Sequence, residues 1–361
     1  MGKLNTNLPV KCWETILERD DISWVGPSAD ADGFCFGTEN GDVFWTDFDG
    51  KLQWELPHAA KLGEAINGIA FNAGQMCVTT RDETANWFLS THKNRVRGGT
   101  IAGGAHGVVS GGSGDFFLPR GIAGLQNIRM DNPSEVLGWE MAPEERDMYF
   151  YEVASLATVD GEQVVACACR RSGLAMGKYT KGETFNIVTL STPKGDFIDI
   201  CPAGIPSLPS AAYALTRDGT IYPFDNVLAD RNPFAMRFQS VGGTAYRILA
   251  SGNFVFVLTS RALHVIHKLL VNDNGLFDDN RDSRMVTFAL EAVDMNLVGD
   301  RWLLVLLTDQ VMRLDLELLK QTVPEFPVET SEPESSEDSD HFIFEEMEMT
   351  SHKFDAKLVT A

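Results

Sequence analysis

Arginine is the charged residue that recurs at similar positions along this chain. In successive stretches of strand, polar turn and strand, an arginine falls in or beside the turn. The planar guanidinium group has five donors and matches carboxylate and phosphate groups. If the turns are equivalent, these side chains lie on one rim and bind an acidic or phosphorylated peptide. The predicted partner-binding arginines are Arg81, Arg120, Arg170, Arg171, Arg217 and Arg261.

Local ion pairs are the alternative use of these arginines. Asp82 directly follows Arg81, and Asp218 directly follows Arg217. Such pairs, or hydrogen bonds within the turn, would occupy the guanidinium groups. For a single arginine the local explanation is favoured, whereas for the whole set we predict recognition of a partner.

Histidine and serine give no catalytic pattern. His264 and His267 are three residues apart, so on a strand they point to opposite faces and cannot bind one metal ion together. His106 lies near Ser113 and Asp115, but the glycine-rich stretch between them lacks the G-x-S-x-G turn that exposes a nucleophile. We predict no catalytic residue.

Metal and cofactor motifs are also missing from the sequence. The six cysteines form no C-x-x-C pair, and no glycine run continues as G-x-x-x-x-G-K-[ST]. Aspartates cluster over 273–282, but their order does not match the EF-hand loop. The sequence therefore predicts neither a metal nor a cofactor.

A hairpin repeats along the chain and sets its architecture. Five copies have an apolar run, a threonine, a polar turn and a return strand, and they span 37–45, 79–87, 215–223, 258–266 and 307–315. Two degenerate copies lie near Pro119 and Arg170. From Thr38 to Thr308 the six intervals average 45 residues, close to the roughly 40–45 of a four-stranded propeller blade.

This repeat predicts an all-β, seven-bladed β-propeller. Each hairpin has an apolar strand before it and another after it, except that the seventh unit has no outer strand of its own. The segment Cys12–Leu17 can supply that strand, which closes the ring and leaves no open edge. A pair of β-sandwiches is the alternative, but it does not predict a sustained period.

The chain resembles the WD40-like propellers. Pro27-Ser28 followed by Asp32-Gly33, then Gly41-Asp-Val-Phe-Trp-Thr-Asp47, is similar to one blade of that family, and Asp218-Gly-Thr-Ile-Tyr222 to part of another. The resemblance covers roughly residues 12–320. It implies that the face with the arginine turns is a binding surface. An enzyme would instead use the innermost strands, whose polar residues are Glu152, Asp199, Arg247, Asp294 and Asn296.

The composition changes near residue 328, so we predict a propeller over 1–327 and an acidic, disordered tail over 328–361. Residues 329–340 contain six acids and no base, and such a segment cannot bury enough apolar surface to fold. Phe342, Ile343 and Phe344 form an apolar cluster within the acidic run. We predict that this motif binds a partner, with packing on the chain's own propeller as the alternative.

Charge and composition narrow the class of function. The formal net charge of −21 repels nucleic acid and anionic membranes, so neither is an expected partner. The absence of a signal segment and the free-thiol pattern favour the cytoplasm. We predict a non-enzymatic scaffold or regulatory subunit that binds proteins. The alternatives are a propeller hydrolase or lyase acting at the central channel, and a sensor of a phosphorylated ligand.

Overall fold

The chain divides by its internal contacts into two units, Met1–Val323 and Pro324–Ala361. The predicted boundary at 327/328 stays a prediction. The computed structural model describes residues 5–6, 12–61, 63–82, 85–88, 97–101, 107–111, 115–122, 124–128, 136–138, 149–159, 162–170, 173–179, 186–189, 196–205, 208, 210–224, 236–237, 244–267 and 283–322. All described residues belong to the first unit, and the predicted tail motif Phe342–Phe344 lies outside them.

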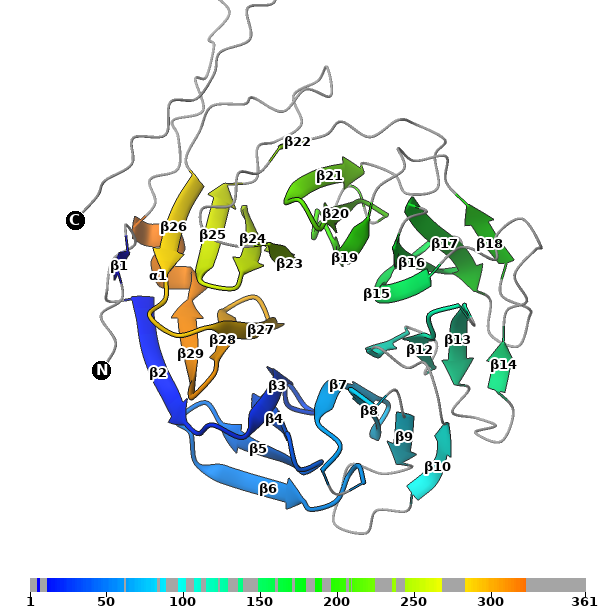
Figure 1. Ribbon diagram of the computed structural model, residues 1–361, viewed down its shortest axis with the longest axis horizontal. Coiled ribbons are helices and arrows are strands. Elements are labelled where there is room, and N and C mark those ends of the chain that lie inside the picture. Colours follow the sequence, from blue (N-terminus) through cyan, green and yellow to red (C-terminus); the bar gives the residue numbers. More distant parts are fainter. Residues whose placement is uncertain are drawn as a thin grey trace, which may run out of the picture. The chain divides into compact units, whose positions relative to one another are not determined.

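The first unit forms a ring of seven antiparallel sheets (Figure 1). Within each sheet the strands follow one another from the channel outward. Blade 1 consists of β3 (Ile22–Pro27), β4 (Gly33–Thr38), β5 (Val43–Asp47) and β6 (Leu52–Leu56). Blade 2 consists of β7 (Ile66–Asn72), β8 (Gln75–Thr80), β9 (Ala85–Phe88) and β10 (Arg97–Ile101). Blade 3 consists of β11 (Val109–Ser110), β12 (Phe116–Pro119), β13 (Leu125–Ile128) and β14 (Val136–Gly138).

The remaining blades have the same order. Blade 4 consists of β15 (Tyr149–Val159), β16 (Glu162–Arg170), β17 (Gly173–Tyr179) and β18 (Asn186–Thr189). Blade 5 consists of β19 (Phe197–Pro202), β20 (Ala212–Thr216), β21 (Thr220–Phe224) and β22 (Met236–Arg237). Blade 6 contains β23 (Ala245–Ser251), β24 (Phe254–Thr259), β25 (Ala262–His267) and β26 (Ser283–Thr287), and blade 7 contains β27 (Ala292–Val298), β28 (Trp302–Leu307) and β29 (Gln310–Asp315).

The N-terminal segment closes the ring, which confirms the sequence prediction. Strand β2 (Trp13–Glu18) pairs antiparallel with β29 and becomes the outer strand of blade 7. Arg313 of β29 donates two hydrogen bonds to Glu14 of β2, so a side-chain contact reinforces the backbone ladder. The sequence did not predict β1 (Asn5–Thr6), which pairs with β26 and gives blade 6 a fifth strand.

Apolar packing between neighbouring blades stabilises the ring. The second strand of a blade is covered on both faces, and every residue of β4, β24 and β28 is accordingly buried. At the closure, Phe34 and Phe36 of blade 1 pack with Leu304 and Leu306 of blade 7. Each such side chain contributes about 1.5–3 kcal/mol on burial. The interface between blades 1 and 7 is therefore packed with apolar side chains, as a domain core is.

The repeated threonine holds the turn between the second and third strands. The Oγ1 atom of Thr38 accepts the backbone N–H of Asp42, and that of Thr259 accepts the backbone N–H of Ala262. In blade 7 the register places Leu307, rather than Thr308, opposite the first inner-strand residue. The prediction that Thr308 is equivalent to the turn threonines of the other blades was therefore wrong by one residue. Thr308 comes after the end of strand β28, and Leu307 occupies the equivalent position.

A short helix ends the described chain. Helix α1 (Leu316–Thr322) follows β29 directly, and Asp315 caps it by accepting the backbone N–H groups of Glu317 and Leu318. Leu319 is buried against the core of blades 6 and 7. The helix was not predicted from the sequence, since it is only seven residues long.

Candidate functional site

An irregularity of the inner strand sets which side chains face the centre of the ring. In six blades the pairing of the first two strands slips by one residue near the start of the inner strand. In each of these blades, one inner-strand residue is the first to pair again after the slip. These residues are equivalent by register, so they lie at the same height along the axis of the ring. They are Trp24, Gly68, Glu152, Asp199, Arg247 and Asp294.

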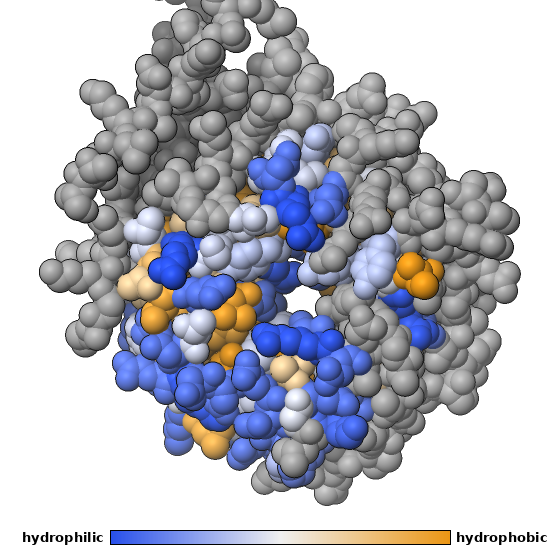
Figure 2. All heavy atoms as spheres, in the orientation of Figure 1, coloured by the Kyte–Doolittle hydropathy of each residue, from blue (hydrophilic) through white to orange (hydrophobic). Residues whose placement is uncertain are grey.

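These residues line a cavity of about 680 Å³ that follows the axis of the ring. The space-filling view leaves an opening at its centre (Figure 2). Four consecutive blades, from 4 to 7, place a charged side chain at this level, whereas blades 1 and 2 place Trp24 and Gly68 there. The channel therefore has one charged side and one largely uncharged side.

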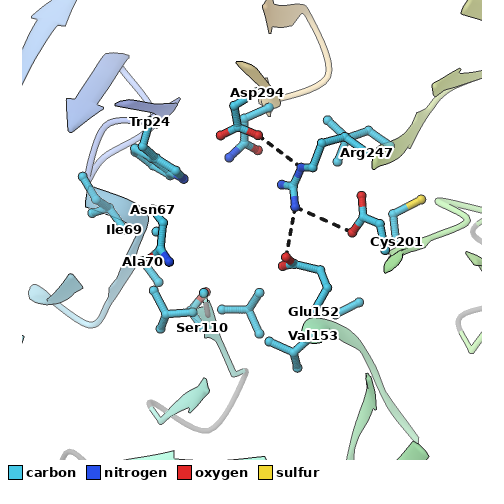
Figure 3. Close-up of a pocket in the computed structure, with 18 of the residues that line it drawn as sticks. Trp24, Asn67, Ile69, Ala70, Ser110, Glu152, Val153, Cys201, Arg247 and Asp294 are labelled. Carbon is cyan, nitrogen blue, oxygen red and sulfur yellow. Dashed lines mark ion pairs between the residues drawn. The ribbon is translucent and has the colours of Figure 1, made fainter. Parts of the chain in front are cut away.

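Arg247 joins the charged side into one cluster (Figure 3). Its Nη1 atom lies 3.2 Å from Oε2 of Glu152 and 3.6 Å from Oδ1 of Asp199, and its Nε atom lies 3.2 Å from Oδ1 of Asp294. One guanidinium group from blade 6 thus contacts carboxylates of blades 4, 5 and 7. These four residues were predicted to be polar groups of the innermost strands, and the structure brings them into contact through Arg247.

Burial changes the pKa values of this cluster. It raises the pKa of Glu152 to about 8, because the opposing effect of Arg247 is smaller and Asp199 and Asp294 add repulsion. Burial also raises the pKa of Asp199 to about 6, against Arg247 and the backbone N–H groups of Ile248 and Ile200. Burial raises the pKa of Asp294 as well. Near neutral pH, Glu152 is therefore largely protonated.

Arg247 itself stays charged. Burial lowers its pKa, but Asp199, Asp294 and Glu152 more than offset that effect, and the net shift is upward. At neutral pH the cluster combines this guanidinium with a mostly ionised Asp199 and a mostly neutral Glu152, while burial also favours the protonated form of Asp294. A general acid and a cation-binding group are the two roles that this chemistry allows.

The opposite wall of the channel carries small and amide side chains. Trp24 packs against blade 2 and also lines the cavity. Asn67 and Gly68 lie beside it, and Asn67 Oδ1 is buried with no hydrogen-bond partner. A Cβ atom on Gly107 would lie 3.5 Å from Oε1 of Glu152, so this glycine leaves space next to the carboxylate.

The predicted arginine turns lie at one end of the ring. Arg81, Arg120 and Arg217 each directly follow the second strand of a blade, and Arg261 follows one residue later. The backbone N–H of Arg81 bonds to the carbonyl of Ala65, and that of Arg217 to the carbonyl of Asp196. The turns are thereby anchored to the segments that precede the inner strands. We call this end of the ring the turn face.

The arginines of the turn face have acidic or amide neighbours. Arg81 Nη1 lies 3.7 Å from Glu39, with the two side chains 51% and 54% exposed, and Arg217 Nε lies 2.9 Å from Asp196. Arg120 donates to Gln126. The predicted partner Asp218 instead accepts the Thr216 hydroxyl, which lowers its pKa. Arg81 and Arg217 therefore pair with acids other than the next residue, and Arg120 bonds to an amide of its own hairpin.

Some predicted residues lie outside the described part of the chain. They are the side chain of Arg170, all of Arg171, Phe342, Ile343 and Phe344, together with His106 and Ser113. His264 is buried, which lowers its pKa to about 4. Among the residues that the structure describes, no group of histidine, cysteine, aspartate and glutamate is arranged to hold a metal ion.

Comparison with known proteins identifies the fold. No sequence family and no curated protein matches the chain. The structure is similar to that of U3-55K, with a TM-score of 0.61 at 8% identity over 86% of this chain and 100% of the other. It is similar to the WD40 repeats of RRP9, with a TM-score of 0.60 at 8% identity over 86% and 99%.

A third similar structure is the β-propeller domain of Cps50 (Swd1) from Myceliophteria thermophila. The TM-score is 0.62 at 12% identity over 86% of this chain and 99% of that one. The chain therefore has a WD40-like β-propeller fold, as predicted. None of the helices that the structure describes has the length and apolar character needed to cross a bilayer.

Proposed function

We propose that this protein acts without catalysis, as a scaffold or regulatory subunit of a cytoplasmic protein complex, and that it binds partners through the turn face and its C-terminal tail. The observation that carries the proposal is the recurrence of arginine at equivalent turns of a rigid ring. Backbone hydrogen bonds hold these turns in place. Binding of a partner therefore costs little conformational entropy at this surface.

The chemistry of the turn face favours an acidic or phosphorylated peptide as the ligand. The ion pairs of Arg81 and Arg217 are half exposed and therefore contribute little to folding. A ligand carboxylate or phosphate can replace Glu39 or Asp196 at small cost and form a bidentate pair. The net charge of −21 disfavours nucleic acid and membrane as partners.

A double variant tests the proposal. Arg217→Ala with Arg261→Ala removes two turn-face arginines that do not line the channel, and Arg301→Ala is the matched control in a turn at the opposite end of the ring. The probe is a fluorescein-labelled peptide of alternating glutamate and serine, with and without phosphate on its serines. The double variant is expected to bind the probe at least about tenfold more weakly. Equal binding by all three proteins would overturn the proposal.

An enzyme at the channel is the second candidate, and the perturbed carboxyl groups favour it. Glu152, with a pKa of about 8, and Asp199, with a pKa of about 6, are in the range useful for proton transfer near neutral pH. Both acids are also engaged by Arg247, which supports a binding or structural role instead. A turnover that disappears in Glu152→Gln, while folding stability is kept, would favour the enzyme over the scaffold.

A further inference from the structure

The channel contains more carboxylates than its one buried arginine can neutralise. In the described part of the chain, the ion pairs of Glu152, Asp199 and Asp294 are formed with Arg247, while Arg81 lines the same cavity and acts on Asp294 from a greater distance. Asp199 also accepts the backbone N–H groups of Ile248 and Ile200 and is fully engaged. Asp294 Oδ1 also accepts the backbone N–H of Met295, but Glu152 and Asp294 both line the cavity and keep further acceptor capacity, since a carboxylate can accept about four hydrogen bonds.

The cavity next to these two carboxylates is lined by groups that have no partner of their own. Trp24 is only 5% exposed, and its indole N–H donates no hydrogen bond within the described part of the chain. Figure 3 shows the indole directed into the channel, across from Arg247 and Glu152. Asn67 Oδ1, on the same wall, is a buried acceptor without a donor.

The shape of the cavity leaves room for a side chain at this point. Gly68 takes the place in the ring that Glu152 and Asp294 take in their blades. Gly107 leaves the space beside Oε1 of Glu152 open. A basic group entering here would meet a carboxylate on one side and the unpartnered Oδ1 atom of Asn67 on the other, and both oxygen atoms attract a cationic donor.

We propose that the channel, between Trp24 and the Glu152–Asp294 side, binds one basic side chain of a partner protein. The ligand class is a guanidinium or ammonium group on a peptide. A metal ion fits less well, because the described residues hold no metal-ligating group of the required geometry. This subsite has the opposite charge preference to the turn face, although Arg81 of the turn face also lines the cavity, so it goes beyond the function proposed above.

Binding of a cation is linked to proton release from Glu152. The charged groups that face Glu152 are Arg247 from β23, Asp199 from β19 and Asp294 from β27, while Arg81, after β8, acts on Asp294. A second cation next to Glu152 favours its ionised form. Below the pKa of about 8, affinity is therefore expected to rise by up to about tenfold for each pH unit.

The experiment uses the full chain and three short peptides. Isothermal titration compares acetyl-Ala-Arg-Ala-amide, the same peptide with lysine, and the same peptide with citrulline, which has the shape of arginine without its charge. We expect binding of the arginine or lysine peptide to exceed that of the citrulline peptide at least tenfold at pH 8, and to weaken toward pH 6.5. Equal binding of the charged and neutral peptides would overturn the proposal.

Two variants locate the site. Glu152→Gln should weaken binding about tenfold and abolish its pH dependence, whereas Glu18→Gln, on the exposed outer strand β2, should change neither. Gly107→Ala adds a methyl group at an ordinary contact distance of 3.5 Å, so the variant should fold and still obstruct the cavity. Full binding by both Glu152→Gln and Gly107→Ala would contradict the proposed site. Loss of acidic-peptide binding at the turn face alone would not contradict the proposed channel site.

Discussion

Replacing Arg247 by methionine tests the energetic role of the channel cluster. The substitution keeps an unbranched side chain but removes the cation that forms ion pairs with Glu152, Asp199 and Asp294. Arg247 is 22% exposed, so water screens its charge only in part. Breaking a buried ion pair by removing one partner costs about 3–5 kcal/mol. We expect a loss in this range at pH 8, where ionised Asp199, whose pKa in the wild type is about 6, would lose its cationic partner.

The loss should shrink as the pH falls. Without Arg247 the carboxyl groups can avoid repulsion only by binding protons, and their pKa values are already raised by burial. At pH 5.5 most of them are neutral, and the difference between variant and wild type should fall to about half or less of its value at pH 8. Urea unfolding at both pH values measures this difference directly.

Arg301→Met is the matched control for this experiment. Arg301 also pairs with an aspartate, Asp315, but its side chain is 61% exposed. Exposed pairs contribute about 0–1 kcal/mol, so this variant should lose no more than that at either pH. If Arg247→Met cost as little as Arg301→Met, or if its cost did not depend on pH, the cluster would not be the buried ion network described above.

Three further perturbations have expected outcomes. In the wild type, Glu152 binds its proton more tightly in the folded state, so the free energy of unfolding falls as the pH rises from about 4.5 to 8. Glu152→Gln should reduce this dependence by up to about 1.4 kcal/mol per pH unit, as measured by urea unfolding. Deleting residues 1–18 removes β2 and exposes the edge of β29, which should lower the melting temperature and produce aggregates in size-exclusion chromatography. Gly33→Ala places a Cβ atom 1.8 Å from the carbonyl oxygen of Thr46 and should cost about 3 kcal/mol or more, whereas Gly107→Ala should cost little.

The ring could be predicted from the sequence because the pattern that indicates each blade is local and recurs along the chain. Each hairpin contains an apolar strand, a turn threonine and a return strand, and the structure confirms the closing strand near Trp13. The additional strand Asn5–Thr6 has no signal, since two residues cannot show a period. The error at Thr308 arose because this residue was assigned to the repeat by its amino-acid type. The equivalent position is set by the pairing of β27 with β28, which the sequence does not reveal.

The channel cluster could be predicted only in part. Glu152, Asp199, Arg247 and Asp294 were recognised as polar residues of inner strands, but their convergence depends on the register slip at the start of each strand. Sequence spacing does not reveal such a slip. The partners of Arg217 were missed for a related reason, because Asp196 is distant in sequence and close only in the folded blade.

A crystal structure or cryo-EM map of the full chain tests the central claim most directly, namely that equivalent residues of four consecutive blades meet at one level of a closed channel. We expect density for the Arg247 guanidinium within hydrogen-bonding reach of both Glu152 and Asp294, with β2 paired to β29. Layered sheets in place of a ring, or these carboxylates on separate surfaces, would contradict it.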